Sequence, residues 1–394
     1  MKKIVFINVG GGPVVKEDGI GFTEGGLVHA LSALTNLASD YDIMVVCPNL
    51  PESGRKQTII YNGVKIVCLG SSKWVSWMHA GELSFTESWW QTVLHWPTIL
   101  ANYVGAYRYV NEEKPDILIG NGILAAFLLT LDRRAPFRAG IIHHLYSVSS
   151  VDGSYKHVMQ AVGALERVFF RLMKLDKIGV VNPTVKDILV KRGFRQDTIV
   201  VVGNGVNIDD YPFSENKTPH SVLFIGSLRK LKRVESLIDA ICLVKKHIPD
   251  VILHIVGDGP KREEIHEKIM ALGVSDNVVM HGYTTEKEKI DLLLSSAVYV
   301  SNSEFEGFGI PLVEAMATGT VPVVNDIASH RLIFQGEDVG YLVSSVGEMS
   351  EKIVELLTNE PRRQQLAQDG RNLVERKWTW RMVGEQYREL LKPL

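Results

Sequence analysis

Short apolar runs alternate with amphipathic stretches along almost the whole chain. The apolar runs are rich in β-branched residues, which is typical of strands buried on both faces of a parallel sheet. The amphipathic stretches repeat apolar residues at helical spacing and predict the helices that connect such strands. This alternation predicts an α/β protein built from strand–helix–strand units.

The predicted elements fall into two sets along the chain. In the first half, strands are predicted at Lys3–Asn8, Ile43–Cys47, Val64–Leu69, Ile117–Gly120, Gly140–His143, Lys177–Val181 and Thr198–Val202. In the second half, strands are predicted at Ser221–Ile225, Val251–Val256, Val278–His281, Val298–Ser301 and Val321–Val324. Helices are predicted at Gly25–Leu37, Trp96–Glu112, Ser154–Met173, Val234–Lys246, Lys261–Ala271, Glu286–Ser295, Pro311–Thr318, Glu348–Thr358 and Pro361–Arg376.

Two domains are expected because the chain has 394 residues, which is too many for one ordinary core. The segment from Gly205 to Lys217 is polar and strand-free, and it is the best candidate for the linker. Since each side has its own strands, we predict two doubly wound, Rossmann-like domains that face one another across a cleft. Ligands of such sheets bind beyond the carboxyl ends of the strands.

Composition and charge exclude several classes of protein. Hydrophobic residues make up 45% and charged residues 22% of the chain, which is the balance of a globular protein. The longest apolar run, Ile123–Leu131, is too short to span a membrane, and the apolar start of the chain stops at Asn8 without a signal-peptide cleavage site. The net charge of −2 and the lack of a basic, aromatic-interleaved run predict no nucleic-acid partner. Three widely spaced cysteines indicate free thiols in a reducing, cytoplasmic compartment.

The most informative stretch runs from Glu306 to Glu314 and places a carboxylate at each end. It follows the predicted strand Val298–Ser301 and passes through a glycine-rich loop into a helix that Pro311 suits as an early residue. At such a junction, free backbone N–H groups and the positive end of the helix dipole favour an anion. The two carboxylates could hold the hydroxyl-rich parts of a nucleotide sugar.

A second glycine loop supplies candidate cations. Gly226 follows a predicted strand, and the next residues include Arg229, Lys230, Lys232 and Arg233. Basic side chains beside a glycine can clamp a diphosphate. A solvated loop with ordinary surface cations has the same appearance, so both interpretations stay open.

Glycines and a histidine near other strand ends are weaker signals. Gly257 follows a predicted strand and marks a turn that any α/β protein can contain. Gly25 and Gly26 could let a helix terminus approach a substrate through its backbone, but their spacing does not match a nicotinamide-binding motif. His143 ends a predicted strand and could face the cleft, although a structural histidine is the commoner explanation.

Two further regions permit contact with a membrane surface. Tryptophans cluster between Trp74 and Trp96, and the segment from Ser154 to Gln196 carries an excess of basic residues. Both features suit an anionic lipid surface and a peripheral position on the inner face of the membrane. A small satellite core and a helix with one solvated face explain them more simply, so the membrane contact stays a hypothesis.

Taken together, these residues resemble the family 4 retaining glycosyltransferases of the GT-B architecture, nearly from end to end. The element Glu306…Glu314, two glutamates separated by seven residues, is the most specific part of the resemblance. Supporting motifs are Gly203–Asn207, Val256–Pro260, Val278–Gly282, Gly319–Val324 and Gly340–Val343. Their order and spacing together are hard to obtain by chance.

The resemblance implies a division of labour between two domains. Residues 1–207, completed by a C-terminal helix at 378–394, are expected to bind the acceptor, and residues 208–377 are expected to bind the donor. The expected catalytic residues are Glu306, His143 and Lys232. The expected donor-binding residues are Gly25, Gly26, Gly226, Arg229, Arg233, Gly257, Gly307, Phe308, Gly309, Ile310 and Glu314.

On the family pattern, Glu306 binds hydroxyls of the donor sugar and Lys232 binds phosphate. Ser227 stands where the family usually has an arginine. This departure leaves Arg229 or Arg233 as candidates to complete the diphosphate clamp.

The reaction implied by the resemblance is transfer of a hexose-type sugar from a UDP- or GDP-linked donor to an acceptor hydroxyl, with retention. Glu314 is expected to bind the ribose. No cofactor beyond the nucleotide sugar and no metal are expected, because no Asp-x-Asp motif is evident. A carbohydrate or lipid-linked acceptor would place the reaction in glycolipid, polysaccharide or cell-envelope glycan synthesis. A nucleotide-sugar 2-epimerase and a non-enzymatic two-domain sugar-binding protein are the alternatives.

Overall fold

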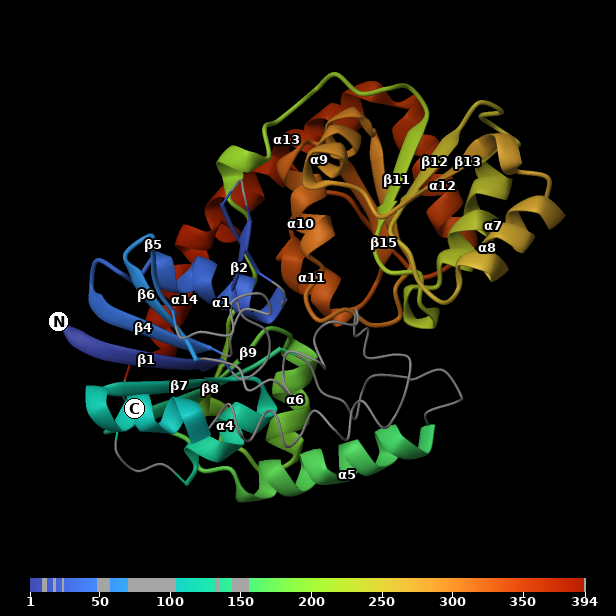
Figure 1. Ribbon diagram of the computed structural model, residues 1–394. Coiled ribbons are helices and arrows are strands. Elements are labelled where there is room, and N and C mark those ends of the chain that lie inside the picture. Colours follow the sequence, from blue (N-terminus) through green and yellow to red (C-terminus); the bar gives the residue numbers. More distant parts are fainter. Residues whose placement is uncertain are drawn as a thin grey trace. The chain divides into compact units, whose positions relative to one another are not determined.

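The computed structural model describes residues 1–8, 13–16, 19–22, 25–47, 57–69, 104–131, 135–143 and 156–392. The chain forms two compact units (Figure 1). The first unit contains Met1–Val181, Val185–Gly203 and Val383–Leu394, and the second contains Asn182–Thr184 and Asn204–Met382. The chain therefore leaves the first unit after Gly203 and returns to it at Val383.

Among the residues described, an eight-stranded sheet forms the centre of the first unit, in the order β10-β9-β8-β7-β1-β4-β6-β5. Neighbouring strands are parallel except β5 and β6. The central strands are continuous apolar runs buried on both faces, whereas β5 alternates half-buried and exposed residues at the edge. The strands are β1 Lys2–Asn8, β4 Tyr41–Cys47, β5 Gln57–Tyr61, β6 Val64–Cys68, β7 Ile117–Asn121, β8 Phe137–Ile142, β9 Lys177–Val180 and β10 Ile199–Val201.

Helices cover this first sheet, and one of them comes from the end of the chain. They include α1 Gly25–Thr35, α4 Ile123–Leu129, α5 Lys156–Leu172, α6 Pro183–Lys191 and α14 Trp380–Leu390. In α14, Tyr387 is fully buried and its hydroxyl lies 3.0 Å from Nε2 of His29 in α1. The C-terminal helix is therefore part of the core of the first unit.

The second unit has a six-stranded, fully parallel sheet in the order β13-β12-β11-β14-β15-β16. The chain builds outward from β11 to β13 and then returns to the middle at β14. The order of strands therefore reverses between β11 and β14, and such a switch point opens a crevice beyond the carboxyl ends of the strands. The strands are β11 Ser221–Ile225, β12 Ile252–Val256, β13 Val278–Gly282, β14 Val298–Ser301, β15 Val321–Asn325 and β16 Tyr341–Val343.

Helices pack on both faces of the second sheet (Figure 1). One core joins the sheet to α7 and α12 through side chains such as Ile238 and Leu356, and the other joins it to α9, α10 and α13 through Leu293, Leu312 and Leu373. The helices are α7 Val234–Val244, α8 Arg262–Ala271, α9 Glu286–Ser295, α10 Ile310–Ala317, α11 Ala328–Phe334, α12 Val346–Thr358 and α13 Glu360–Lys377.

The predicted fold class, two Rossmann-like α/β domains, is confirmed, and each predicted strand is present within a few residues of its expected bounds. Several elements were not predicted because they are short or lack a clear period. They are the hairpin of β2 Pro13–Lys16 and β3 Gly19–Phe22, the strands β5 and β16, and the helices α4, α6 and α11. The helix α4 shows why: all of its residues are apolar, so its sequence carries no helical period.

Two sequence-based expectations touch residues beyond the described ranges. The tryptophan cluster from Trp74 to Trp96 lies outside them, and so does the beginning of the helix predicted at Trp96–Glu112, of which 104–113 are described and helical. Within the described ranges, no helix has the length and the apolar content needed to cross a membrane.

Candidate active site

Glycine loops follow β11 and β12 and pack tightly against each other. Gly257 has φ +126°, a left-handed conformation, and a Cβ atom there would lie 2.1 Å from the carbonyl oxygen of Gly226. The N–H of Gly257 donates to the carbonyl of Gly282, the last residue of β13, 2.8 Å away. Only glycine fits at position 257, so the strand-end loops form one rigid edge.

Lys232 and Glu306 form an ion pair at this edge. The Lys232 ammonium lies 2.6 Å from both carboxylate oxygens of Glu306. The Ser303 hydroxyl donates to Oε1 of Glu306 at 2.7 Å, and the N–H of Glu304 donates to the carbonyl of Leu231 at 2.8 Å. The two side chains are only 22% and 14% exposed, so the pair is partly shielded from water. The structure thus brings together two of the three predicted catalytic residues.

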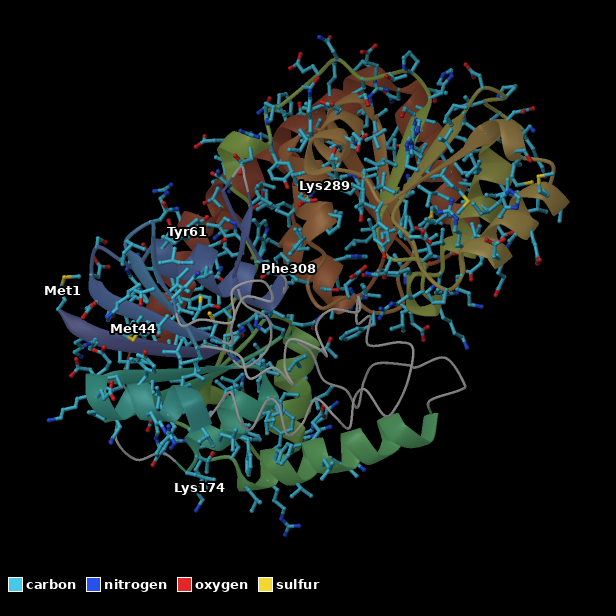
Figure 2. All side chains as sticks on the ribbon, viewed as in Figure 1. Met1, Met44, Tyr61, Lys174, Lys289 and Phe308 are labelled. Atoms are coloured by element: carbon cyan, nitrogen blue, oxygen red, sulfur yellow. The ribbon has the colours of Figure 1, made fainter. Side chains whose placement is uncertain are left out.

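The glycine-rich loop leads into α10 beside that ion pair. Gly309 has φ +108° and is the N-cap residue of α10, which begins at Ile310, one residue before the predicted start. Phe308, labelled in Figure 2, is buried and packs edge-on against Trp378 with ring centroids 5.4 Å apart. This anchor holds the first turn of α10, and with it the free N–H groups of a helix N-terminus, next to Glu306.

Glu314 lies in the middle of α10, and a separate network of hydrogen bonds and ion pairs holds its carboxylate. Its Oε1 lies 2.7 Å from the Tyr211 hydroxyl and 2.9 Å from Nζ of Lys289, which is labelled in Figure 2. Lys289 also lies 2.8 Å from Glu286. Burial lowers the pKa of Lys289, but the two carboxylates outweigh it and the pKa is raised overall. The ammonium therefore stays charged and neutralises the buried Glu314 carboxylate.

Arg229 and Arg233, the arginines predicted to help bind the diphosphate, differ from Lys232 in their exposure to solvent. Arg229 and Arg233 are both exposed, and Arg233 adopts a left-handed backbone conformation with φ +49°. Ser227 is half-buried in the same loop. The expectation that one of these arginines completes the clamp stays a prediction.

His143 belongs to a different polar network, at the carboxyl ends of β1, β7 and β8 in the first unit. Its Nε2 lies 2.7 Å from Oδ1 of Asn121, and Nδ2 of Asn121 donates to Oδ1 of Asn8 at 2.7 Å. Because the amide nitrogen of Asn121 is the donor to Asn8, its oxygen accepts from His143, which assigns the ring proton to Nε2. The rings of His29 and His143 meet edge to face with their centroids 5.1 Å apart. Burial lowers the pKa of His29 well below its usual value, and electrostatic repulsion from His143 lowers it further.

Gly25 and Gly26 are the first residues of α1. The structure therefore places them at a helix start in the first unit, where the sequence predicts a backbone that can approach a substrate. Nothing in the described contacts assigns them a ligand.

Sequence reasoning missed several residues of these networks. Tyr211 lies in the segment predicted as a polar linker, yet it is buried and reaches Glu314. Lys289 had no signal beyond its place on a predicted helix. Asn121 directly follows a predicted strand, so its position at a carboxyl end could have identified it.

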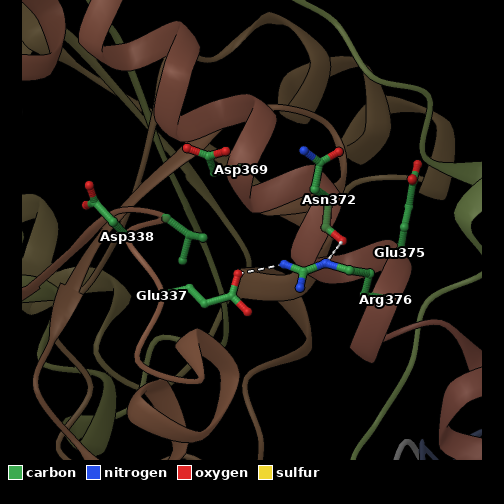
Figure 3. Close-up of a pocket in the computed structure, with 7 residues that line it drawn as sticks. Glu337, Asp338, Asp369, Asn372, Glu375 and Arg376 are labelled. Atoms are coloured by element: carbon green, nitrogen blue, oxygen red, sulfur yellow. Dashed lines mark hydrogen bonds and ion pairs between the residues drawn. The ribbon is translucent and has the colours of Figure 1, made fainter.

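A hollow away from these networks lies beside α13. It has a volume of about 600 Å³, and its lining includes Glu337, Asp338, Asp369, Asn372, Glu375 and Arg376 (Figure 3). Arg376 is paired with Glu337 at 2.6 Å. None of the predicted site residues lines this hollow. Across the described residues, no group of three or more His, Cys, Asp or Glu side chains is placed to hold a metal ion.

Two glycosyltransferase family models match the chain. The model described as Glycosyltransferase Family 4 matches residues 24–210, and the model described as Glycosyl transferases group 1 matches residues 207–373. The two matches meet in the segment predicted as the linker.

Curated relatives carry glycosyltransferase names. The chain is 24% identical over 293 residues to poly(ribitol-phosphate) alpha-N-acetylglucosaminyltransferase of Staphylococcus aureus (strain COL), a match that covers 72% of this chain and 56% of that protein. It is 31% identical over 196 residues to phosphatidyl-myo-inositol mannosyltransferase of Mycobacterium leprae (strain TN), covering 48% of this chain and 51% of that protein. The chain thus spans about half the length of these relatives.

A solved structure shares the fold over the full length. HepE of Anabaena, in complex with UDP-glucose, superimposes with a TM-score of 0.70 at 15% identity and covers 99% of both chains. The predicted resemblance is confirmed, and neither alternative, the epimerase or the binding protein, is favoured by these comparisons. The chain belongs to the family 4 glycosyltransferases of the GT-B fold.

Proposed function

We propose that this protein transfers a hexose-type sugar from a UDP- or GDP-linked donor to an acceptor hydroxyl, with retention at the anomeric carbon. The observation that carries the proposal is the Lys232–Glu306 pair, placed at the switch point of the second sheet beside the N-terminus of α10. Glu314 lies on the same helix. A cation, a helix N-terminus and two carboxylates are the groups that a diphosphate flanked by two sugars requires.

The second unit supplies the donor site in this proposal. The diphosphate lies against the first turn of α10, where the N–H groups of Phe308, Gly309 and Ile310 and the Lys232 ammonium meet its charge. Glu306 accepts from hydroxyls of the donor sugar. Glu314 accepts from the ribose through Oε2, because both of its described hydrogen bonds go to Oε1.

The chemistry follows from charge development. When the leaving group departs, negative charge builds on the diphosphate and positive charge builds on the anomeric carbon. Lys232 and the α10 N-terminus stabilise the first, and Glu306 stabilises the second. Front-face attack gives retention: the acceptor oxygen forms a bond to the anomeric carbon as the bond to the phosphate oxygen breaks, and that phosphate oxygen takes the acceptor proton.

The first unit supplies acceptor contacts and one contact to the transferred sugar. His143 is held by Asn121 in a single tautomer at the carboxyl end of the sheet. An imidazole whose orientation is fixed by an amide can form a directed hydrogen bond with a sugar hydroxyl. The names of the two relatives above refer to poly(ribitol-phosphate) and to phosphatidyl-myo-inositol, which supports a polymeric or lipid-linked acceptor here.

The outer face of α5 supports peripheral contact with an anionic membrane. Leu165, Val168 and Leu172 lie on one side of the helix and are 47%, 50% and 54% exposed. The inner face is packed, with Phe169 stacked on Phe127 at 4.5 Å. Exposed basic residues lie near this stripe: Arg167 and Arg171 on α5, and Lys174, labelled in Figure 2, just after the helix ends. An apolar stripe edged by cations fits a surface of acyl chains and anionic headgroups.

A donor panel tests the proposed transfer. The purified chain is screened for thermal stabilisation by UDP-glucose, UDP-galactose, UDP-N-acetylglucosamine and GDP-mannose. The donor that stabilises it is then incubated with a simple glycoside acceptor, and the anomeric configuration of the product is read by proton NMR. An α-linked product from an α-linked donor supports the proposal. An inverted product, or no stabilisation by any of the four donors, contradicts it.

Sedimentation with vesicles tests the membrane contact. Wild type is expected to sediment with vesicles of phosphatidylglycerol at low salt and to be released at high salt. A variant with Leu165, Val168 and Leu172 replaced by Ser should sediment less, while phosphatidylcholine vesicles should bind neither protein. Equal sedimentation of variant and wild type would rule out α5 as the contact.

A further inference from the structure

A buried histidine on α11 approaches the predicted donor site from the neighbouring strand. His330 is only 1% exposed and follows β15, which pairs with β14 in the sheet. Its Nδ1 lies 2.6 Å from the carbonyl oxygen of Asn325, the last residue of β15. A carbonyl can only accept, so Nδ1 carries the ring proton and the orientation of the ring is fixed.

The opposite edge of the ring packs against the N-cap of α10. A Cβ atom on Gly309 would lie 3.8 Å from Cδ2 and 4.0 Å from Nε2 of His330. This edge therefore borders the same helix N-terminus that the proposed diphosphate contacts. In the neutral ring Nε2 has a lone pair and can only accept, whereas in the protonated ring it donates.

Burial favours the neutral form of the His330 ring. Burial lowers the pKa of His330, and Lys232 lowers it further. The hydrogen bond to Asn325, Glu306 and Asp326 act in the opposite direction without cancelling the burial. Asp326 is itself paired with Arg331 at 2.5 Å. A diphosphate at α10 would add negative charge close to Nε2 and favour the protonated ring.

We propose that His330 is a further donor-binding residue, whose Nε2 takes up a proton from solvent and donates a hydrogen bond to the diphosphate when the nucleotide sugar binds. The proposal rests on the function proposed above. It adds a second cation to the clamp, one that exists only in the complex. Donor affinity must then increase as the pH falls, because the proton is a co-ligand of the complex.

Calorimetric titration of UDP-glucose and of GDP-mannose tests this role. A nucleotide sugar is the right probe because its diphosphate is esterified at both ends and keeps its charge across the titration range. Each titration is run between about pH 6 and about pH 8, in two buffers that differ in ionisation enthalpy. Wild type is expected to take up protons on binding and to gain affinity on acidification, by about tenfold per pH unit at most.

Three variants separate the role of Nε2 from a structural role. His330→Gln places a neutral donor near the position of Nε2, and His330→Asn keeps only the hydrogen bond to Asn325. Both are expected to bind without proton uptake and with an affinity that does not change with pH, and His330→Asn is expected to bind more weakly. The control His266→Gln, an exposed histidine on α8, should behave as wild type does. Circular dichroism verifies that each variant is folded.

The possible outcomes are distinct. Affinity that falls on acidification would mean that neutral Nε2 accepts from a hydroxyl, and unchanged proton uptake in both His330 variants would place the uptake elsewhere. Either result overturns the role of His330 while leaving the proposed function intact. If wild type binds neither nucleotide sugar, the proposed function fails and the role of His330 fails with it.

Discussion

The two units carry different chemistry at the carboxyl ends of their strands. In the second unit the strand ends present formal charges, above all the Lys232–Glu306 ion pair. In the first unit the corresponding positions hold amides and an imidazole: Asn8, Asn121 and His143 form a chain of hydrogen bonds across three adjacent strands. Both sets of side chains are partly buried, and each side chain named has a hydrogen bond or an ion pair with another member of its set.

This difference indicates which part of a substrate each unit suits. A buried cation is stable only beside an anion, so the charged edge gains most from a ligand that brings its own charge, such as a diphosphate. Neutral amides and imidazoles bind hydroxyl groups without a charge to compensate, which suits a sugar or a glycan. In the proposed function, the second unit binds the donor and the first unit contacts the sugar, so variants in each unit should affect different steps.

Removal of the Glu306 carboxylate should have the largest effect. Glu306→Gln is expected to lower kcat for transfer by at least about a hundredfold, because the carboxylate stabilises charge on the reacting sugar. The affinity for UDP should not fall, since the change releases Lys232 from its ion pair and leaves it free for phosphate. Initial-rate kinetics and UDP titration measure the two quantities.

A matched carboxylate on the same unit provides the control for Glu306. Glu351 is exposed on α12, and Glu351→Gln should leave both quantities unchanged. If Glu306→Gln retains more than about a tenth of the wild-type kcat, the carboxylate is not part of the reaction.

Loss of the Lys232 ammonium should have the next largest effect, on donor affinity. A hydrogen bond to a charged partner contributes about 1.5–3 kcal/mol, so Lys232→Ala is expected to weaken UDP binding by about tenfold to a hundredfold. Lys268 is similarly exposed, lies 2.6 Å from Asp239 on another part of the same unit and serves as the control. Equal UDP affinity in wild type and Lys232→Ala would remove this lysine from the donor site.

His143 should affect transfer without affecting the nucleotide. Because the proposed contact of His143 is a hydrogen bond to the sugar and not to the nucleotide, His143→Ala is expected to lower kcat/KM by about tenfold and to leave UDP affinity unchanged. Asn121→Ala, which frees the tautomer of His143, should change kcat/KM in the same direction by a smaller factor. A loss of UDP affinity in His143→Ala would contradict the separation of roles between the units.

The smallest expected effect is on stability in acid. His29 is buried with a lowered pKa, so below pH 6.5 the unfolded chain binds a proton that the folded first unit does not. The stability of this unit should therefore fall as the pH falls, by about 1.4 kcal/mol per pH unit at most. Hydrogen exchange in β1 measures it, and His29→Gln should show a shallower slope. An unchanged slope in the variant would assign the acid sensitivity to other groups.

The fold was largely predictable because buried parallel strands are continuous apolar runs that sequence periodicity detects. Glu306 and Lys232 were predictable for a local reason as well: each lies in a glycine loop directly after such a strand. Their mutual ion pair could not be predicted, because it joins loops that are far apart in sequence and depends on the order of the strands.

Tyr211 and His330 have no local signal in the sequence. Tyr211 lies in a polar segment and becomes a partner of Glu314 only because Arg371 of α13 anchors its carbonyl, 2.6 Å away, and so holds that segment in place. His330 lies on a short helix without a period, and only the pairing of β14 with β15 brings it to Gly309. Such contacts follow from tertiary packing, which local sequence patterns do not reveal.

Hydrogen exchange with and without UDP tests the central claim most directly, because it reports on both units in one experiment. The account predicts that UDP slows exchange in the peptides covering 226–233 and 303–317 and leaves 117–143 unchanged. Protection of 117–143 without protection of 226–233 would contradict it.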